Sequence, residues 1–455
     1  MNIIIIGAGK VGFSLAEYFS ALGHQITVIE QDKKLCEHVN SKLDVFVVEG
    51  LGTNPAVLES ANIGTADMFI AVSSNDEANI LSCNFAMQSG VKRRIARVKS
   101  AMYTAPSDSV DLEKTGVTTV VEPEKGTVER IIQYVELPGV LETANFQNNS
   151  IYLRGYRITE EMSLAGKTLA EIKELAKSSP MLFVVIVRGG KSIPPTGEQR
   201  LLPGDEIVAI MPAESFKVFR SLINNKPSKM NKIVVSGDSL TAVHLAEALR
   251  PLAEQVILAD PDYDHGHWAA SEVEGIDVFH GDSTDTSVLE EINIKHADCF
   301  IVAGRDPEDN IMSCLLAKHE GADMVIAIRD DDRYEGLFDS LGVDHVINSR
   351  EIILNSIIEK IQTISFGTYL KLKTAEVEIM RLKVGKRSSV VGKALQSLSK
   401  LHKKGIIIGC MIRGEDVIIP WGATTIETDD ELLIFCSKND IKWVNKLFNP
   451  PKETA

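Results

Sequence analysis

The chain has 455 residues, of which 44% are apolar and 24% are charged, which is the composition of an ordinary globular protein. This composition excludes collagen-like and disordered classes, and the length predicts several domains at about 150 residues each. The formal net charge of −15 makes the molecule as a whole repel nucleic acid and anionic lipid.

The N-terminal part of the chain alternates short β-rich runs with helix-like patterns. The β-rich runs are Ile3–Ile6, Gln25–Glu30, Val45–Val48, Met68–Val72, Ile95–Val98 and Thr118–Val121. The helix-like patterns begin near Val11, Lys33, Pro55, Asp76, Ser107 and Lys125. Because nearly every strand is followed by a crossover helix, this segment predicts an α/β fold with a Rossmann-like, doubly wound parallel sheet.

A smaller and more β-rich pattern follows. Strand-like runs at Met181–Val187 and Glu206–Met211 are separated by the turn signals Gly189-Gly190 and Pro203-Gly204. We therefore expect a small α+β domain after the parallel sheet.

The sequence repeats this two-part arrangement. The segment Asn2–Phe19 aligns with Lys232–Leu249, and further along Asp205-Glu206 aligns with Asp430-Glu431. The two copies join near Asn224–Asn231, which is polar and carries a proline. The predicted domains cover residues 1–136, 137–224, 231–360 and 361–450.

Gly7-Ala8-Gly9-Lys10-Val11-Gly12 is a GxGxxG motif that follows a strand and opens a helix, which is the context of a dinucleotide fingerprint. Gly7 permits a tight turn, Gly9 lets the backbone approach a pyrophosphate, and Gly12 permits close packing of helix and sheet. Glu30, followed by Gln31, ends the second strand, where a carboxylate can accept hydrogen bonds from ribose hydroxyls. A carboxylate there repels a 2′-phosphate, so the pattern favours NAD over NADP.

Other candidate binding residues lie at the carboxyl edge of the predicted sheet. Ser73 and Ser74 follow the fourth strand, and Asn79 lies in the helix after it. Lys10 and Arg97 are cations placed where they could meet a phosphate. Helix capping explains Ser73 and Asn79 equally well, and a solvated side chain explains Lys10 equally well.

The second copy has lost most of the fingerprint. Its loop, Gly237–Ala242, keeps only the first glycine and places Asp238 where it would repel a phosphate. Asp260, which matches Glu30, could still hold a ribose and is kept as a candidate second site. The favoured interpretation is a degenerate structural copy.

Motifs of known catalytic chemistry are missing from the sequence. It contains no GxSxG, HExxH or P-loop motif and no substrate domain that offers an acid or base to a nicotinamide. We therefore expect a protein that is not an enzyme. His265 and His267 lie near carboxylates that could help to chelate a metal, but a polar loop with adventitious histidines is favoured.

Cysteine spacing and hydropathy bear on the compartment. The six cysteines form no CxxC pair and are expected to be buried thiols. Apolar stretches fall well short of the roughly 20 residues that cross a bilayer. The sequence enters a strand directly after Met1, without a basic or cleavable signal, so a cytoplasmic location is expected.

The glycine-rich loop, Glu30, the Asp76–Asn79 stretch, Arg97 and the small β-rich module, all in tandem repeat, resemble the NAD-binding subunits of Trk-type potassium uptake systems. The resemblance runs from about Met1 to Phe448. It implies two RCK pairs, each a TrkA-N and a TrkA-C domain, with NAD or NADH, and additionally ATP or ADP, as ligands.

The same resemblance implies a cellular setting. Such a subunit lies on the inner face of the cell membrane as a peripheral protein, forms a homo-oligomer, expected to be a tetramer, and gates an integral-membrane, TrkH-like potassium transporter. The missing glycines of the second copy put a second NAD site in doubt. The alternative function is an NAD-dependent oxidoreductase of unknown substrate, which would show hydride transfer.

Overall fold

The computed structural model describes residues 1–100, 103, 111–147, 149–177, 179–224, 229–329, 338, 341–360, 366–371 and 377–449. The predicted helix near Ser107 and the centre of the predicted join, residues 225–228, lie outside these ranges. The chain forms two compact units. The first combines Met1–Ile132 with Lys229–Ile361, and the second combines Gln133–Ser228 with Gln362–Ala455.

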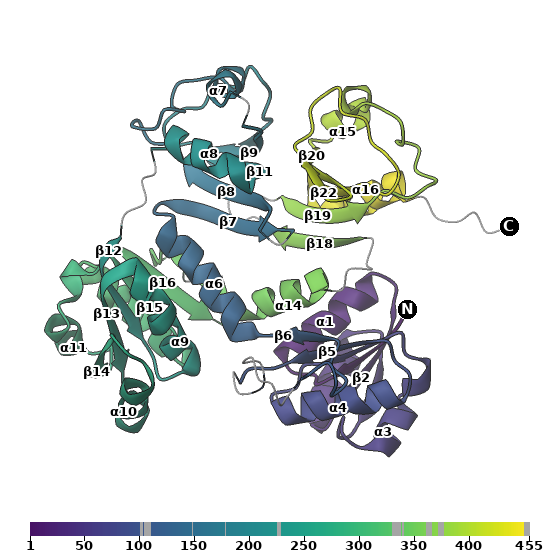
Figure 1. Cartoon of the computed structure of the whole chain (residues 1–455), viewed down its shortest axis with the longest axis vertical. Coiled ribbons are helices and arrows are strands. Elements are labelled where there is room, and N and C mark those ends of the chain that lie inside the picture. Colours follow the sequence, from purple (N-terminus) through teal and green to yellow (C-terminus); the bar gives the residue numbers. More distant parts are fainter. Residues whose placement is uncertain are drawn as a thin grey trace. The chain divides into compact units, whose positions relative to one another are not determined.

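The first large module is a six-stranded parallel sheet with the strand order β3-β2-β1-β4-β5-β6. Its strands β2, β5 and β6 are labelled in Figure 1. Its strands are β1 (Asn2–Ile6), β2 (Gln25–Glu30), β3 (Phe46–Glu49), β4 (Met68–Ala71), β5 (Arg93–Arg97) and β6 (Thr119–Val121). Its helices are α1 (Lys10–Ala21), α2 (Lys33–Lys42), α3 (Pro55–Ser60), α4 (Asp76–Gln88) and α6 (Pro123–Glu136). Ile3 to Ile6 of the central strand are all buried, as expected when helices cover both faces of a parallel sheet.

The second large module repeats this topology, with the order β14-β13-β12-β15-β16-β17. Its strands are β12 (Met230–Ser236), β13 (Ala253–Asp260), β14 (Asp277–His280), β15 (Cys299–Val302), β16 (Met324–Arg329) and β17 (His345–Asn348). Its helices are α9 (Leu240–Leu249), α10 (Tyr263–Glu272), α11 (Thr286–Glu291), α12 (Pro307–His319) and α14 (Ser349–Lys360). The prediction of two tandem Rossmann-like sheets is confirmed.

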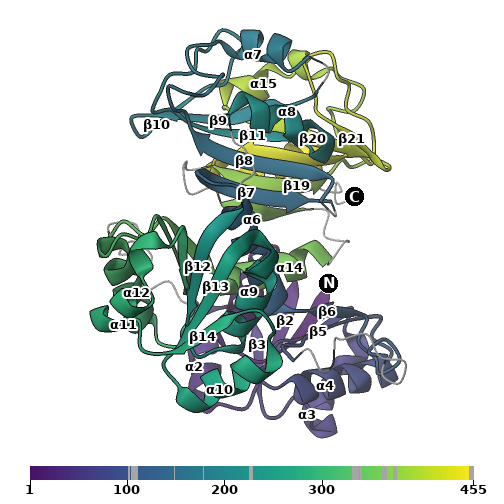
Figure 2. The ribbon, with the colours of Figure 1, turned by 60° about the vertical axis from the view of Figure 1, so that its left-hand side comes forward.

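Each small module is an antiparallel five-stranded sheet with short helices (Figure 2). The first has the strand order β10-β9-β11-β8-β7 and the second β18-β19-β22-β20-β21. The first contains β7 (Val140–Phe146), β8 (Ile151–Arg157), β9 (Leu182–Arg188), β10 (Lys191–Ile193), β11 (Glu206–Pro212), α7 (Leu169–Leu175) and α8 (Phe216–Leu222). The second contains β18 (Phe366–Lys371), β19 (Glu378–Lys383), β20 (Ile407–Arg413), β21 (Asp416–Ile418), β22 (Glu431–Cys436), α15 (Ser399–Lys403) and α16 (Ile441–Phe448).

The two small modules share one hydrophobic core inside their unit. Apolar side chains from both sheets, including Val208 and Ile210 of β11 and Leu433 and Phe435 of β22, belong to a single buried cluster. The prediction of α+β domains after each parallel sheet is confirmed. The domain boundaries given above stay predictions.

All six cysteines are buried and free, as expected. Within the described part of the chain, we find no helix with the length and apolar character that a membrane span requires.

Candidate nucleotide-binding site

A cavity of about 310 Å³ opens at the carboxyl ends of β1, β2 and β4. The strand order reverses between β1 and β4, which is the switch point where open α/β sheets bind ligands. Five residues predicted from the sequence line this cavity: Gly7, Glu30, Gln31, Ser73 and Ser74. Their roles in binding stay predictions.

The glycine-rich loop is built by the close approach of the backbone at Gly7 and Gly12. Gly7 has a φ of +96°, and a Cβ atom on it would lie 3.1 Å from the backbone of Ser73 at the end of β4. A Cβ atom on Gly12 would lie 1.8 Å from the carbonyl oxygen of Gly7. Packing of the protein itself therefore requires glycine at both positions.

Gly9 has a different environment from the other two glycines. Its φ is −62°, which any residue can adopt, and a Cβ atom on it would meet no atom within 4 Å. It is the N-cap residue of α1, and no side chain caps this helix. Neither packing nor backbone strain therefore requires glycine here, although glycine is a favoured N-cap residue. A phosphate held against this uncapped helix N-terminus would gain from the missing side chain.

Glu30 ties the glycine-rich loop to the end of β2. Its carboxylate accepts hydrogen bonds from the backbone N–H of Ala8 at 2.6 Å and of Asp32 at 2.9 Å. Each carboxylate oxygen has a further lone pair, so Glu30 can accept from ribose hydroxyls as well. Lys10 is exposed at the first residue of α1, and Val11 is buried against the sheet.

Asn79 does not line the cavity, although it was a candidate binding residue. It is fully buried; its side chain accepts from the backbone N–H of Ser73 at 3.0 Å and donates to the carbonyl of Arg97 at 2.9 Å. Asn79 does not cap α4 either, because Asn75 is the N-cap residue and accepts from the N–H of Ala78. The hydroxyl of Ser73 accepts from the N–H of Asn75 at 3.3 Å, so Ser73 does satisfy a backbone amide at the start of this helix. Asn79 instead links the ends of β4 and β5.

Arg97 is likewise not part of the cavity lining. It ends β5 in a half-buried position, where burial lowers the pKa of its guanidinium and the carboxylates of Glu124 and Asp76 oppose that shift. Burial raises the pKa of the Glu124 carboxyl. Asp76 also accepts from the backbone N–H groups of Lys99 and Ser100. The electrostatic partners of Arg97 are therefore carboxylates of its own module.

The loop after β3 was not predicted as part of the site, yet it supplies Gly50, Leu51, Gly52 and Thr53 to the cavity. Gly50 is held close to Val57, and Gly52 close to Ile6. The repeat contained a clue to this loop, because Gly50 aligns with Gly281 of the second copy.

In the second large module, the side chains at the positions equivalent to the fingerprint interact with one another or with the backbone. Arg305 makes an ion pair with Asp238 at 3.3 Å, and the hydroxyl of Ser239 caps α9. Asp260 is fully buried, with one oxygen accepting from the N–H of Asp262 and the other 2.5 Å from Nδ1 of His265. Asp260 is thus satisfied by its own module.

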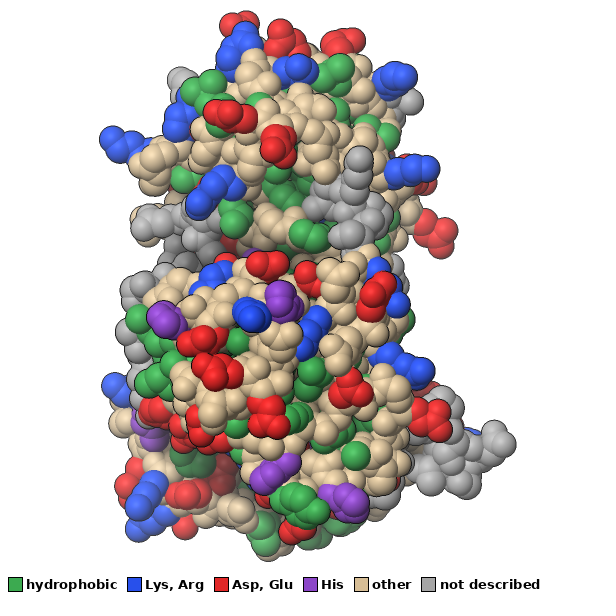
Figure 3. Space-filling view, turned by 90° about the vertical axis from the view of Figure 1, so that its left-hand side faces the viewer, with side chains coloured by type: hydrophobic (Ala, Val, Ile, Leu, Met, Phe, Trp, Pro, Cys, Tyr) green, Lys and Arg blue, Asp and Glu red, His purple; other side chains and the backbone are tan. Residues whose placement is uncertain are grey.

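The interpretation of His265 and His267 as part of a polar loop is wrong, because both lie in α10. Histidine and acidic side chains share one face in the space-filling view (Figure 3). Among the described residues, however, no group of three or more metal-binding side chains is found.

Comparison with known proteins identifies the modules. The family model of the TrkA-N domain matches residues 3–123 and 233–349, and that of the TrkA-C domain matches residues 153–224 and 379–449. The chain is thus of the class that carries a Rossmann-like TrkA-N domain and a TrkA-C domain twice in tandem.

Relatives match along nearly the whole chain. A protein of Archaeoglobus fulgidus named Trk system potassium uptake protein TrkA homolog is 30% identical over 449 residues, which cover 98% of this chain and 100% of that protein. The Trk system potassium uptake protein TrkA of Azorhizobium caulinodans is 27% identical over 98% of both chains. The chain belongs to the TrkA family.

Solved structures share the fold at low identity. The crystal structure of the GsuK RCK domain superposes with a TM-score of 0.62 at 18% identity, covering 99% of this chain and 95% of that chain. The GsuK channel bound to NAD gives the same TM-score and identity, covering 99% and 79%.

Proposed function

We propose that this chain is the nucleotide-responsive regulatory subunit of a potassium uptake system, binding NAD or NADH in its first large module. The observation that carries the proposal is the open space in front of Gly9, beside an uncapped helix and within a loop fixed by Glu30. The relatives are named as Trk system potassium uptake proteins, which supports potassium uptake as the transport system. The carboxylate of Glu30 disfavours a 2′-phosphate, so NAD(H) is preferred over NADP(H).

Regulation requires that the nucleotide bind one conformation of the assembly better than another. The coupling free energy in such systems is typically about 1–3 kcal/mol. We infer that the chain acts as a cytoplasmic homo-oligomer, tetrameric in our proposal, beneath an integral-membrane potassium transporter subunit. ATP and ADP are candidate competitors for the same cavity, because they share the adenosine and phosphate groups.

We further propose that the protein catalyses no reaction. Supporting this, none of the described residues that line the cavity is His, Lys, Tyr or Cys, the usual proton donors and acceptors beside a nicotinamide. Steady loss of the NADH absorbance at 340 nm with candidate metabolites would instead establish an oxidoreductase.

Isothermal titration calorimetry with NADH, NAD, ATP and ADP tests the binding proposal. Gly9→Asp places a carboxylate against the phosphate position and should reduce NADH affinity by at least tenfold. Ser239→Asp is the matched control, because it puts the same group at the equivalent position of the second module and should leave NADH affinity unchanged. Wild-type protein that binds none of the four nucleotides would refute nucleotide sensing.

A further inference from the structure

The loop after β3, Gly50–Thr53, continues the nucleotide cavity on the side of β2 that lies away from β1. The N–H of Gly50 donates to the carbonyl of Glu30 at 2.8 Å, as the N–H of Gly7 donates to the carbonyl of Ile29 at 2.9 Å. The glycine-rich loop, Glu30 and the loop after β3 therefore follow one another across the sheet. Since neighbouring strands lie about 4.8 Å apart, β1 and β3 are separated by roughly 10 Å.

The position of the nucleotide base follows from this order and rests on the proposed function. In that function the pyrophosphate lies before Gly9, and the carboxylate of Glu30 accepts from the hydroxyls of the adenosine ribose. The base and the phosphate leave different ends of this ribose. With the phosphate toward β1, the base is directed toward β3 and comes against the loop Gly50–Thr53.

Leu51 gives this loop an apolar side chain at the cavity. It lines the cavity and is 54% exposed, so its side chain is available to cover one face of a base ring. In the second module the equivalent residue is Asp282, whose carboxylate accepts from the N–H and the hydroxyl of Thr284 at 2.9 and 2.8 Å. The same loop is thus built with either a leucine or an aspartate at this position.

A leucine and a carboxylate at this position select bases differently. Adenine carries an amino group, which donates, where hypoxanthine carries an oxygen, which accepts. A carboxylate only accepts and would favour adenine, whereas hydroxyls and amides serve both bases because they donate and accept. Among the described residues that line the cavity, Glu30 supplies the carboxylate, and the N–H groups of Ala8 and Asp32 hold it at the ribose position. The other polar side chains of this described wall are hydroxyls and amides, from Gln31, Thr53, Ser73, Ser74 and Asn75.

We propose that Leu51 sets the base specificity of the nucleotide cavity and makes it unselective between adenine and hypoxanthine. The base is held by apolar contact with its ring, while Gly9 and Glu30 select the pyrophosphate and the ribose. The ligand class of the site is therefore a nicotinamide–purine dinucleotide with a free 2′-hydroxyl, rather than NAD or NADH alone.

Calorimetric titration of the full chain with NADH and with reduced nicotinamide hypoxanthine dinucleotide tests this specificity. We expect the two Kd values of the wild type to agree within about threefold. Leu51→Asp, which copies the second module, should bind NADH at least fivefold more tightly than the hypoxanthine form. Leu51→Asn has nearly the same shape as that variant but donates as well as accepts, so its two Kd values should again agree. Asp282→Leu is the matched control in the second module and should leave both Kd values unchanged.

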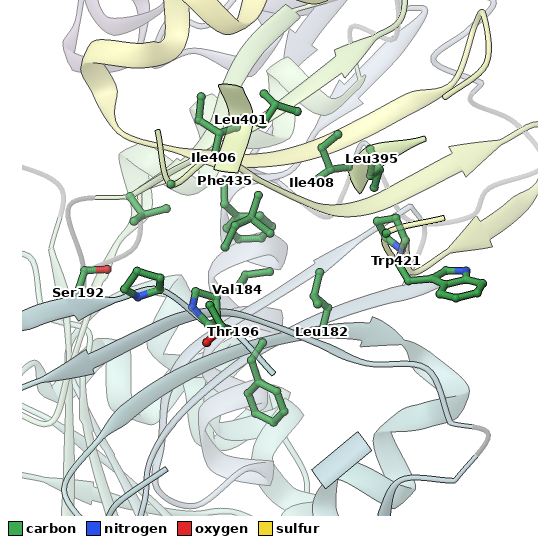
Figure 4. Close-up of a pocket in the computed structure, with 18 of the residues that line it drawn as sticks. Leu182, Val184, Ser192, Thr196, Leu395, Leu401, Ile406, Ile408, Trp421 and Phe435 are labelled. Atoms are coloured by element: carbon green, nitrogen blue, oxygen red, sulfur yellow. The ribbon is translucent and has the colours of Figure 1, made fainter. Parts of the chain in front are cut away.

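A further control concerns a cavity in the unit of the two small modules, whose wall includes Leu182, Ile408 and Trp421 (Figure 4). The indole of Trp421 is 66% exposed, and an exposed aromatic ring can stack on a purine. Trp421→Thr should leave both Kd values unchanged, because the base lies in the first large module. Loss of NADH binding in Trp421→Thr would place the base elsewhere and overturn the assignment to Leu51.

The two wild-type Kd values distinguish failure of the base specificity from failure of nucleotide binding. Wild type that binds neither dinucleotide would refute the proposed function, and the role of Leu51 with it. Wild type that binds NADH at least tenfold more tightly than the hypoxanthine form would overturn the role of Leu51 and leave nucleotide binding intact. An unchanged ratio of Kd values in Leu51→Asp, with a melting temperature like that of wild type, would overturn this role as well.

Discussion

Gly9 and Gly12 belong to one loop but are glycine for different physical reasons. A Cβ atom on Gly12 would overlap the carbonyl of Gly7, so Gly12→Ala must move backbone and should cost about 3 kcal/mol or more of stability. A Cβ atom on Gly9 meets open space at an ordinary φ, so Gly9→Ala should cost only the N-cap preference for glycine over alanine, less than about 1 kcal/mol of stability. It should nevertheless weaken NADH binding at least tenfold in calorimetry. A large loss of stability in Gly9→Ala would show that the fold itself requires this glycine.

Comparison of Asn79 with the equivalent residue of the second module indicates whether its role is structural or in binding. Asn310 repeats its contacts in the second module, accepting from the N–H of Gly304 at 3.1 Å and donating to the carbonyl of Ile328 at 3.3 Å. Because the second module lacks the nucleotide fingerprint, the shared pattern is a link between strand ends.

We therefore expect Asn79→Ala and Asn310→Ala each to lower the free energy of unfolding by about 2–4 kcal/mol, since each leaves buried backbone groups without partners. Urea unfolding of both variants is the measurement. Loss of NADH binding in Asn79→Ala without loss of stability would restore its role as a binding residue.

Much of the candidate site followed from the sequence, and what was missed has a physical cause. Gly7, Glu30, Gln31, Ser73 and Ser74 line the cavity because strand ends in a parallel sheet meet at one edge. The electrostatic partners of Arg97 could not be predicted, since its interaction with the carboxylates of Glu124 and Asp76, which lie on other elements, depends on tertiary packing.

Among the elements, the parallel sheets were easier to predict than the small modules. In β8, buried Arg154 interrupts the apolar pattern and donates to the carbonyl of Ala144 at 2.9 Å and to the side chain of Asn145 at 2.8 Å. The next residue, Gly155, must be small, because a Cβ atom there would lie 2.8 Å from the side chain of Glu142. Because a buried arginine and a glycine stand where the alternation of apolar and polar residues would continue, β8 could not be recognised as a strand from its sequence pattern.

A repeated arginine–aspartate pair stabilises the ends of strands in both small modules. Arg188 of β9 holds Asp205 with two hydrogen bonds of 2.7 Å, and Arg413 of β20 holds Asp430 at 2.8 and 2.9 Å. Burial by itself raises the pKa of Asp205, but hydrogen bonds from Arg188 and from the N–H of Leu202 outweigh it and place the pKa below 3.8. The ionised form therefore stabilises the fold.

Asp205→Asn should lower the free energy of unfolding by about 2–3 kcal/mol at pH 7. A lowered carboxyl pKa gives stability that is fully present above the unfolded-state value near 3.8 and is lost as pH falls through the folded-state value. The difference between wild type and variant should thus shrink below about pH 4 in urea unfolding. Glu206→Gln, which breaks the exposed pair with Arg157, is the adjacent control and should cost less than about 0.5 kcal/mol. A pH-independent difference for Asp205→Asn would contradict the ionic explanation.

At the scale of the whole molecule, duplication supplied two large modules, and the residues that distinguish them predict one nucleotide per chain. In the second module Asp238 forms an ion pair with Arg305, and Ser239 caps α9. The carboxylate of Asp260 is hydrogen-bonded to His265. Calorimetric titration with NADH should therefore give a stoichiometry of one, and Gly9→Asp should remove the whole signal at that site. A stoichiometry of two NADH per chain would contradict this prediction. So would a binding heat in Gly9→Asp of about half the wild-type value that disappears in Asp260→Ala, because the second module would then bind nucleotide.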